Sequence, residues 1–163
     1  MPTYYVCSRN QVAKLTSKVG ATHILSLLDP GVRPYLHPKT DRNNWLLISC
    51  CDLLKETEFN APKREQVSRI LDWGKQLPRD AIVIVHCEAG ISRSTAAALA
   101  LMAQDTNNDI DECIKRLVDV RPTACPNPII SKYADELLNC NGRLYEAAEA
   151  LSKKYLLKFY APY

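Results

Sequence analysis

The hydrophobic positions in the first half of the chain alternate between the period of a strand and that of a helix. Short apolar runs at residues 3–7, 24–28 and 45–51 are typical of strands, whereas residues 12–19 repeat their apolar side chains at helical spacing. A helix is predicted from about Lys63, and an unbroken β-branched run follows at residues 81–85. Such a run is typical of a strand covered on both faces, as in a parallel sheet.

Helical spacing dominates the second half of the sequence. Apolar positions there predict four helices, at residues 92–102, 109–120, 130–138 and 144–155. Strands that alternate with helices, followed by helices alone, indicate an α/β fold. We therefore predict a single domain over residues 1–163. It should have a central, mostly parallel sheet of about four to five strands, helices on both faces of that sheet, and a helical C-terminal half.

The composition excludes several classes of protein. Of the 163 residues, 47% are hydrophobic and 24% are charged, which is typical of a globular chain and not of a disordered one. The net charge of +3 is scattered, so we expect no nucleic-acid surface. There is no signal-peptide pattern and no apolar stretch near the roughly 18 residues of a membrane span. We therefore expect a cytoplasmic chain without stable membrane insertion, and the sequence leaves its oligomeric state open.

The cysteines and histidines do not suggest a metal or a disulfide framework. Seven cysteines are an odd number, and no two of them have C-x-x-C spacing. The three histidines, His23, His37 and His86, form no cluster with them. We expect no metal and no cofactor, and we expect the cysteines other than Cys87 to be buried apolar fillers.

One junction between strand and helix carries a concentration of reactive residues, His86-Cys87-Glu88-Ala89-Gly90-Ile91-Ser92-Arg93-Ser94. Ligands of open α/β sheets bind at such junctions, beyond the carboxyl ends of the strands. A tight loop that opens a helix directs backbone N–H groups inward, and the helix dipole favours an anion. Gly90 permits close approach of the backbone to an oxyanion, and Arg93 can bind two phosphoryl oxygens. We predict a phosphate-binding loop formed by Glu88, Ala89, Gly90, Ile91, Ser92 and Arg93.

Cys87 is the candidate nucleophile of this loop. The positive field of the helix N-terminus and of Arg93 favours the thiolate, which is the nucleophilic form of cysteine. Ser94 can donate its hydroxyl to the sulfur and so help the sulfur to depart in a later step. The loop could thus accept a phosphoryl group on sulfur and transfer it to water.

These residues resemble the signature of the protein tyrosine phosphatase superfamily, HC-x5-R-S/T. They are most similar to the loop of the small dual-specificity branch, HCxxGxSRS, and every fixed position is filled. The resemblance extends more weakly from about Ala21 to Leu138. It implies a phosphatase-type loop between strand and helix, a phosphocysteine intermediate, and no metal. It also implies a phosphotyrosine protein or peptide as substrate, with phosphoserine and phosphothreonine as further substrates, and a role for His86 behind the loop.

The resemblance also implies a general acid that protonates the leaving oxygen. In the family this is an aspartate roughly 30 to 35 positions before the cysteine. Asp52 lies 35 positions before Cys87 (87 − 52) and follows the strand at residues 45–51. We therefore predict that Asp52 is the general acid and later the base that activates water. Asp41 and Asp29 are the alternatives, because both lie in loops that could reach the same edge of the sheet.

Several other residues allow two interpretations. Glu88 would repel a bound dianion unless its side chain turns outward, for example to an arginine. Arg33 and His37 could flank the pocket, although a solvated loop is favoured. For Arg121 and Asn127 packing is favoured over contact.

Two further features also stay open. Cys50 or Cys51 could pair with oxidised Cys87, but filling is favoured. The basic and aromatic residues 153–160 could suit a partner or a membrane surface, although docking on the protein's own core is favoured.

Three rival functions remain. A phosphoinositide or small-metabolite phosphatase is the first, but its lipid-directed members usually carry lysines in the loop, and none lies between Cys87 and Arg93. A catalytically idle phosphate-binding module is the second, and such proteins usually lose the cysteine or the arginine. A thiol-based oxyanion reductase is the third, and it would need additional reactive cysteines.

Overall fold

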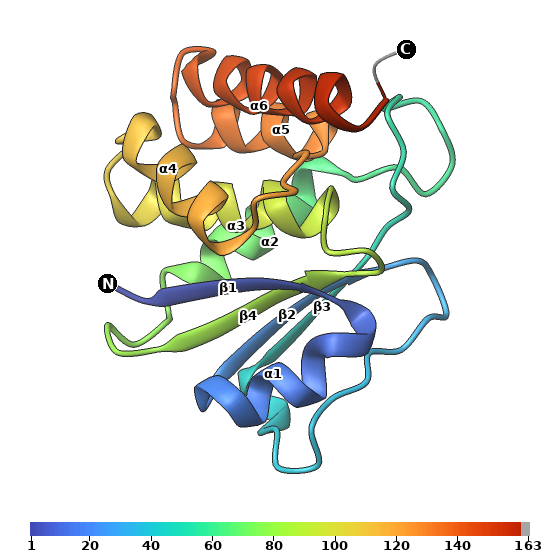
Figure 1. Cartoon of the computed structure of the whole chain (residues 1–163), viewed down its shortest axis with the longest axis vertical. Helices are drawn as coiled ribbons and strands as arrows, with labels where there is room; N and C mark the ends of the chain where they lie inside the picture. Colours follow the sequence, from blue (N-terminus) through green and yellow to red (C-terminus); the bar gives the residue numbers. More distant parts are fainter. Residues whose placement is uncertain (161–163) are drawn as a thin grey trace.

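The computed structural model describes residues 1–160, which form a four-stranded, wholly parallel sheet (Figure 1). The strands are β1 (Thr3–Ser8), β2 (His23–Leu28), β3 (Trp45–Ser49) and β4 (Ile82–Cys87), in the spatial order β1-β4-β2-β3. The predicted α/β class and parallel sheet are thereby confirmed. Because all four strands are parallel, their carboxyl ends lie at one edge of the sheet, where β1, β2 and β4 are in register.

Three strands end at different residues than the sequence predicts, and β1 differs least, since it ends at Ser8 and not at residue 7. β3 stops at Ser49 and not at Cys51: the Cys50 amide still donates to the Leu28 carbonyl, but the Cys51 amide donates to the Asn60 carbonyl. That second bond takes the chain out of the sheet. β4 runs two residues beyond the predicted run, through His86 and Cys87, so the candidate nucleophile is the last residue of the strand.

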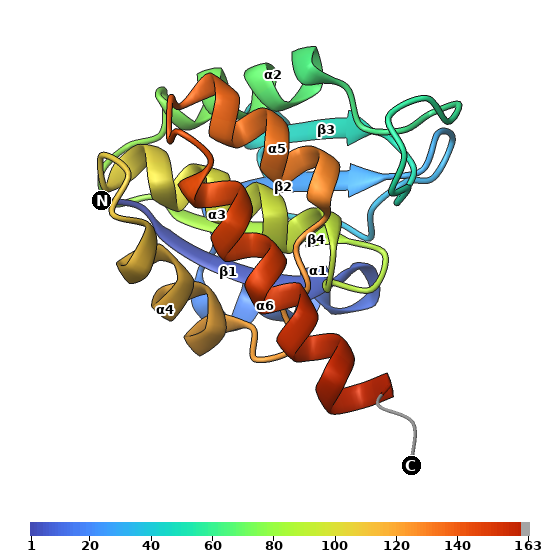
Figure 2. The same cartoon turned by 90° about the horizontal axis from the view of Figure 1, so that it is seen from above.

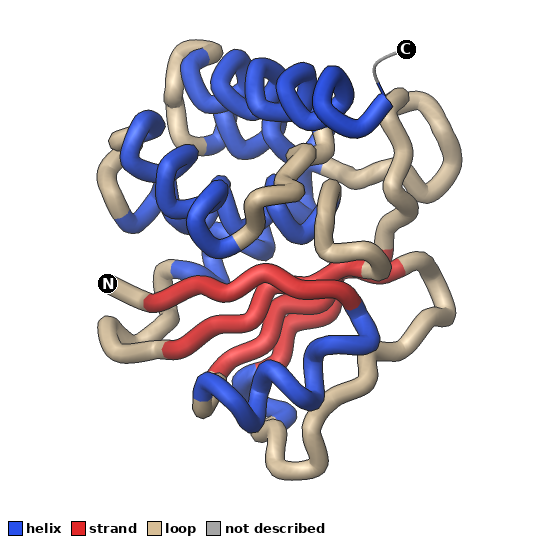
Figure 3. The backbone as a smooth tube through the Cα atoms, in the orientation of Figure 1, coloured by secondary structure: helices blue, strands red, loops and turns tan. Residues whose placement is uncertain are grey.

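Six α-helices accompany the sheet, most of them on one face. Figures 1 and 3 show α1 on one side of the sheet and the other helices on the opposite side. Two 3-10 turns, at Arg9–Gln11 and Arg42–Asn44, complete the elements. The helices are α1 (Val12–Val19), α2 (Arg64–Gly74), α3 (Arg93–Asp105), α4 (Ile110–Val120), α5 (Pro128–Leu137) and α6 (Arg143–Tyr160).

The helix that follows the candidate loop, α3, lies inside the molecule. Every one of its residues from Arg93 to Ala103 is buried, because α3 packs against the sheet and against α2, α4 and α5. Alanines and Gly74 of α2 make this possible, since a side chain at Gly74 would collide with Leu101. A helix held on all sides fixes its first turn, and with it Arg93, relative to β4.

The last helix is only partly docked. Leu144 and Ala148 of α6 are buried, but Leu156, Leu157, Phe159 and Tyr160 stay at least 50% exposed. The prediction that the apolar side of residues 153–160 docks on the core is therefore wrong for these four side chains. Figure 2 shows the end of α6 extending past the other helices. Within residues 1–160, no helix has the length and apolar character needed to cross a membrane.

Candidate active site

The loop between β4 and α3 surrounds the sulfur of Cys87. The side chain of Cys87 is buried, its Sγ accepts a hydrogen bond from the Gly90 amide at 3.2 Å, and the Ser94 hydroxyl lies 3.1 Å from the same sulfur. Both groups can donate to a thiolate. The loop therefore directs two possible donors to the atom that the sequence predicts to be the nucleophile.

The loop is seated on the end of β1. Gly90 has a φ of +70°, and a Cβ built on it would lie 2.6 Å from the Ser8 amide nitrogen and even closer to the Cys7 carbonyl carbon. The Arg9 amide donates to the Glu88 carbonyl at 3.0 Å. The exposed Glu88 carboxylate forms an ion pair with the half-buried Arg9 guanidinium at 3.8 Å, which is the outward arrangement considered from the sequence.

Arg93 is buried and only partly satisfied by the protein. Its Nη1 donates at 2.6 Å both to the Asp29 carboxylate and to the Cys50 carbonyl. Burial lowers the pKa of the guanidinium, but the nearby Cys87, Asp29 and Asp52 outweigh that effect and raise it, so Arg93 stays a cation. Its Nε is buried without a partner among the described residues. An unpartnered, buried N–H of a cation is expensive, and an oxyanion would satisfy it.

Asp52 is one of two predicted acid candidates that the structure brings to the loop. Its Oδ1 accepts a hydrogen bond from the Ser92 hydroxyl at 2.6 Å and another from the Asn127 amide group at 2.9 Å. Its Oδ2 has no hydrogen-bond partner among residues 1–160. Asp29 also reaches the loop, but as the ion-pair partner of Arg93 at 2.6 Å, whereas Asp41 caps the turn at residues 42–44.

His86 lies behind the loop in a directed chain of hydrogen bonds. Its Nδ1 is 3.3 Å from the Cys87 carbonyl oxygen, which can only accept, so Nδ1 carries the proton. Nε2 then accepts from the Ser26 hydroxyl at 2.6 Å, and Ser26 accepts from the Trp45 indole at 3.0 Å. Burial lowers the pKa of His86 to about 4, so the ring is neutral near pH 7.

Arg121 and Asn127, for which the sequence favoured packing, contact the loop and Asp52 directly. Arg121, which caps α4, donates to the carbonyls of Gly90 at 2.7 Å and Ala89 at 3.0 Å. Asn127, which caps α5, holds Asp52 and donates to the Leu53 carbonyl. The Asn-Pro pair at the start of α5 signals the cap in the sequence, but no sequence signal links Arg121 to carbonyls 31 and 32 residues away.

The remaining candidates lie outside the loop. In the segment after β2, the Arg33 carbonyl accepts from Arg9 and the His37 ring accepts from the Lys39 amide, so neither of these interactions reaches the loop. All seven cysteines are free thiols. Burial raises the pKa of Cys50 to about 12, which makes that thiol unreactive. The other cysteines besides Cys87 are buried fillers, as predicted, except Cys51 and Cys125, which are half-buried.

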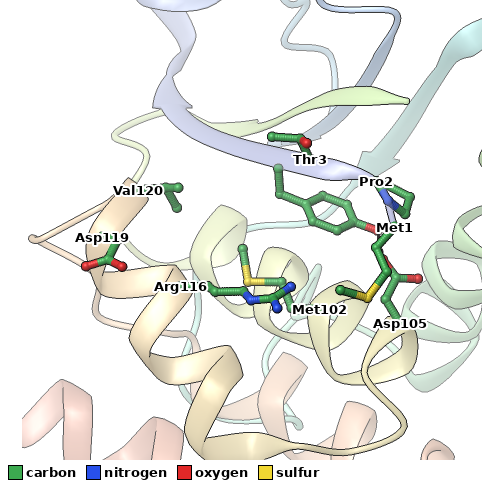
Figure 4. A pocket seen from close by; sticks show the side chains of 9 residues that line it. Met1, Pro2, Thr3, Met102, Asp105, Arg116, Asp119 and Val120 are labelled. Carbon is green, nitrogen blue, oxygen red and sulfur yellow. Dashed lines mark hydrogen bonds between the residues drawn. The ribbon is translucent and has the colours of Figure 1, made fainter. Parts of the chain in front are cut away.

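A cavity lies at the end of the strands opposite to the phosphate loop (Figure 4). It has a volume of about 290 Å³ and is bounded by the start of β1, the end of α3 and one side of α4. In this cavity the Tyr4 hydroxyl donates to Asp105 at 2.7 Å. Thr3 pairs with Ile82, whereas Ser8 pairs with Cys87, so the cavity is about five residues of strand, some 16 Å, from the candidate nucleophile. It is not the candidate active site.

Comparison with known proteins points to one class. No family model matches the chain. It is 28% identical over 117 residues to dual specificity protein phosphatase 16 of Homo sapiens, covering 66% of this chain and 17% of that protein. It is 25% identical over 142 residues to tyrosine-protein phosphatase yvh1 of Schizosaccharomyces pombe, covering 86% and 41%. The chain spans at most 41% of the length of the curated relatives that it matches.

Solved structures that align with this chain over most of its length are also phosphatases by their names. Human DUSP28 aligns with a TM-score of 0.66 at 16% identity, over 94% of this chain and 96% of the other. DUSP15 aligns with a TM-score of 0.62 at 18% identity, over 99% of this chain and 96% of the other. PTPMT1 in complex with PI(5)P aligns with a TM-score of 0.55 at 16% identity, over 96% of this chain and 94% of the other.

The class that fold and sequence both resemble is the small dual-specificity branch of the protein tyrosine phosphatase superfamily. The chain has the fold of that branch and is similar in sequence to its members, so the resemblance predicted from residues 86–94 is confirmed.

Proposed function

We propose that this chain is a metal-independent protein phosphatase that hydrolyses phosphotyrosine, with phosphoserine and phosphothreonine as further substrates. One observation carries the proposal: a sulfur that two donors can stabilise as an anion lies at the base of a loop whose buried arginine has an unpartnered N–H. A phosphate dianion supplies both the electrophile for the sulfur and the acceptor for the arginine. The curated relatives, which are named as protein phosphatases, support a phosphorylated protein as the substrate.

The first step transfers the phosphoryl group to sulfur. The Cys87 thiolate attacks phosphorus, the S–P bond forms, and the bond from phosphorus to the ester oxygen breaks. Asp52 gives its proton to that departing oxygen, and its unoccupied Oδ2 is the atom that carries it. Arg93 and the backbone amides of residues 88–93 hold the three remaining phosphoryl oxygens through the transition state.

The second step releases phosphate. Asp52, now a carboxylate, takes a proton from a water molecule whose oxygen attacks the phosphorus of the phosphocysteine. The S–P bond breaks and its electrons return to the sulfur. Ser94, 3.1 Å from Sγ, stabilises the departing thiolate by donating its hydroxyl. Phosphate leaves, Cys87 is again a thiolate, and Asp52 holds the proton taken from water, so both residues are ready for another cycle.

A lipid phosphate is the second candidate substrate. PTPMT1, whose structure aligns over nearly the whole chain, is described in complex with PI(5)P. The loop of this chain has Glu88 beside the binding site and no lysine between Cys87 and Arg93, which favours a substrate of lower negative charge than a phosphoinositide. A phosphotyrosine peptide is such a substrate.

Phosphate release from a phosphotyrosine peptide in the presence of EDTA tests the proposal. Wild type should turn over with EDTA present, and Cys87→Ser should lower the rate by roughly a thousandfold or more. Cys113→Ser is the matched control, because that buried thiol lies 3.1 Å from the Thr106 hydroxyl, which can satisfy a serine. Turnover that EDTA abolishes, or that survives in Cys87→Ser, would overturn the mechanism.

A further inference from the structure

An apolar groove begins at the candidate active site and continues between the start of α5 and the side of α6. Its volume is about 340 Å³. We call it the α5–α6 groove, and its apolar boundary consists of Leu54, Cys125, Pro126, Pro128, Ala148 and Leu156. Leu54 and Leu156 stand at its mouth, where they are 70% and 50% exposed.

The hydroxyl groups in the wall of this groove already have partners within the protein. Ser131 donates to the Asn127 carbonyl at 2.9 Å, Ser152 donates to the Pro126 carbonyl at 3.3 Å, and Tyr145 donates to Glu149 at 3.3 Å. Glu149 also lies 3.9 Å from the Lys153 ammonium, so the two charges at the rim offset each other. The surface that the groove presents to a ligand is therefore apolar and carries no net charge. It favours ligands that bury apolar area in it.

The groove shares a wall with the catalytic site. Ser92 belongs both to the phosphate loop and to the lining of the groove, and its hydroxyl donates to Asp52 at 2.6 Å. Leu54, at the mouth, is two residues from Asp52. During the first step the leaving oxygen contacts the Asp52 carboxyl group. The substrate residue that carries this oxygen therefore lies beside the groove.

We propose that the α5–α6 groove is a substrate subsite that binds an apolar side chain flanking the phosphorylated residue of a protein or peptide. This inference rests on the proposed function and deepens it, because it names a sequence preference. A peptide is favoured over a phospholipid because the groove carries no net positive charge, which an anionic lipid surface would require beside the site. An apolar side chain that enters the groove loses its contact with water and leaves no buried polar group unsatisfied.

The experiment compares phosphotyrosine peptides in which one leucine is moved through the positions next to the phosphotyrosine in a serine background. Leucine at one of these positions should raise kcat/KM about tenfold over the all-serine peptide. Leu156→Ser should abolish that gain while leaving the hydrolysis of a small aryl phosphate unchanged. Leu157→Ser is the matched control: it is the next residue of the same helix, 70% exposed, and does not line the groove.

Three results would overturn the inference. The first is an equal rate for all peptides, and the second is a leucine preference that persists in Leu156→Ser. The third is a Leu156-dependent preference for a diacyl phosphoinositide over its soluble headgroup. Failure of the proposed function would look different, because wild type would then not hydrolyse the aryl phosphate at all. Even then, the affinity of the Cys87→Ser protein for the same peptides tests the groove, since binding needs no turnover.

Discussion

Gly90 is a residue that the loop can hardly replace. Its φ of +70° lies in the left-handed region, and the space that a side chain would need is occupied by the backbone of Cys7 and Ser8. Backbone atoms of a paired strand cannot move aside as a flexible side chain can. Left-handed backbone costs a non-glycine residue roughly 1–2 kcal/mol, and the collision adds to that cost.

We predict that Gly90→Ala lowers kcat by roughly a hundredfold, because it displaces the loop from the end of β1. Gly20→Ala is the matched control. Gly20 has nearly the same φ, +67°, but no atom lies within 4 Å of its missing Cβ. Steady-state kinetics and thermal unfolding of both variants separate the two effects. Equal kinetic losses in the two variants would show that the contact with β1 is unimportant.

His86 should make stability depend on pH. Because burial lowers its pKa from 6.5 to about 4, the unfolded chain binds a proton between these values and the folded chain does not. The free energy of unfolding therefore falls as pH drops from about 6.5 towards 4, by up to about 3 kcal/mol.

Denaturant unfolding at several pH values checks this, with His86→Gln as the reference. The difference between wild type and the variant should shrink as the pH falls. A difference that stays constant across this range would contradict a neutral, buried His86.

Among the elements, the N-terminus of α5 does two things at once. The side chain of Asn127 accepts from the Ile129 and Ile130 amides, which caps the helix, and donates to Asp52, the proposed general acid. Asp109 caps α4 by accepting from the Glu112 amide, and among residues 1–160 it forms no hydrogen bond with Cys87, Arg93 or Asp52. The two caps thus form a natural pair for comparison.

Asn127→Ala and Asp109→Ala should each cost about 1 kcal/mol of stability. We expect only Asn127→Ala to slow catalysis, and to slow phosphoserine peptides more than aryl phosphates, because a poor leaving group needs the proton of Asp52 more. The ratio of the phosphoserine rate to the aryl phosphate rate, measured in each variant, isolates the contribution of the Asp52 proton. An unchanged ratio in Asn127→Ala would mean that Asn127 does not position Asp52.

For the whole molecule, the sequence predicts those features that depend on local pattern. The β-branched run of β4 and the small residues of α3 define the strand–loop–helix junction, and the loop signature places Cys87 and Arg93 on it. Contacts between distant segments are not encoded in this way. The ion pair of Arg93 with Asp29 joins residues 64 apart, and Arg121 reaches the loop from the end of α4. The exposure of the end of α6 is likewise not predictable from the local pattern, because its apolar residues repeat at helical spacing whether or not other residues cover them.

The most direct test of the account is to trap the intermediate. Asp52→Asn should still accept a phosphoryl group from an aryl phosphate, whose leaving group needs little help. It should hydrolyse the intermediate slowly, because the base that activates water is missing. After acid quenching, mass spectrometry of the digested protein should find one phosphoryl group on the peptide that contains Cys87, and none when Cys87→Ser is added. Phosphate release without a phosphoenzyme, or a phosphoryl group on another residue, would contradict the phosphocysteine mechanism.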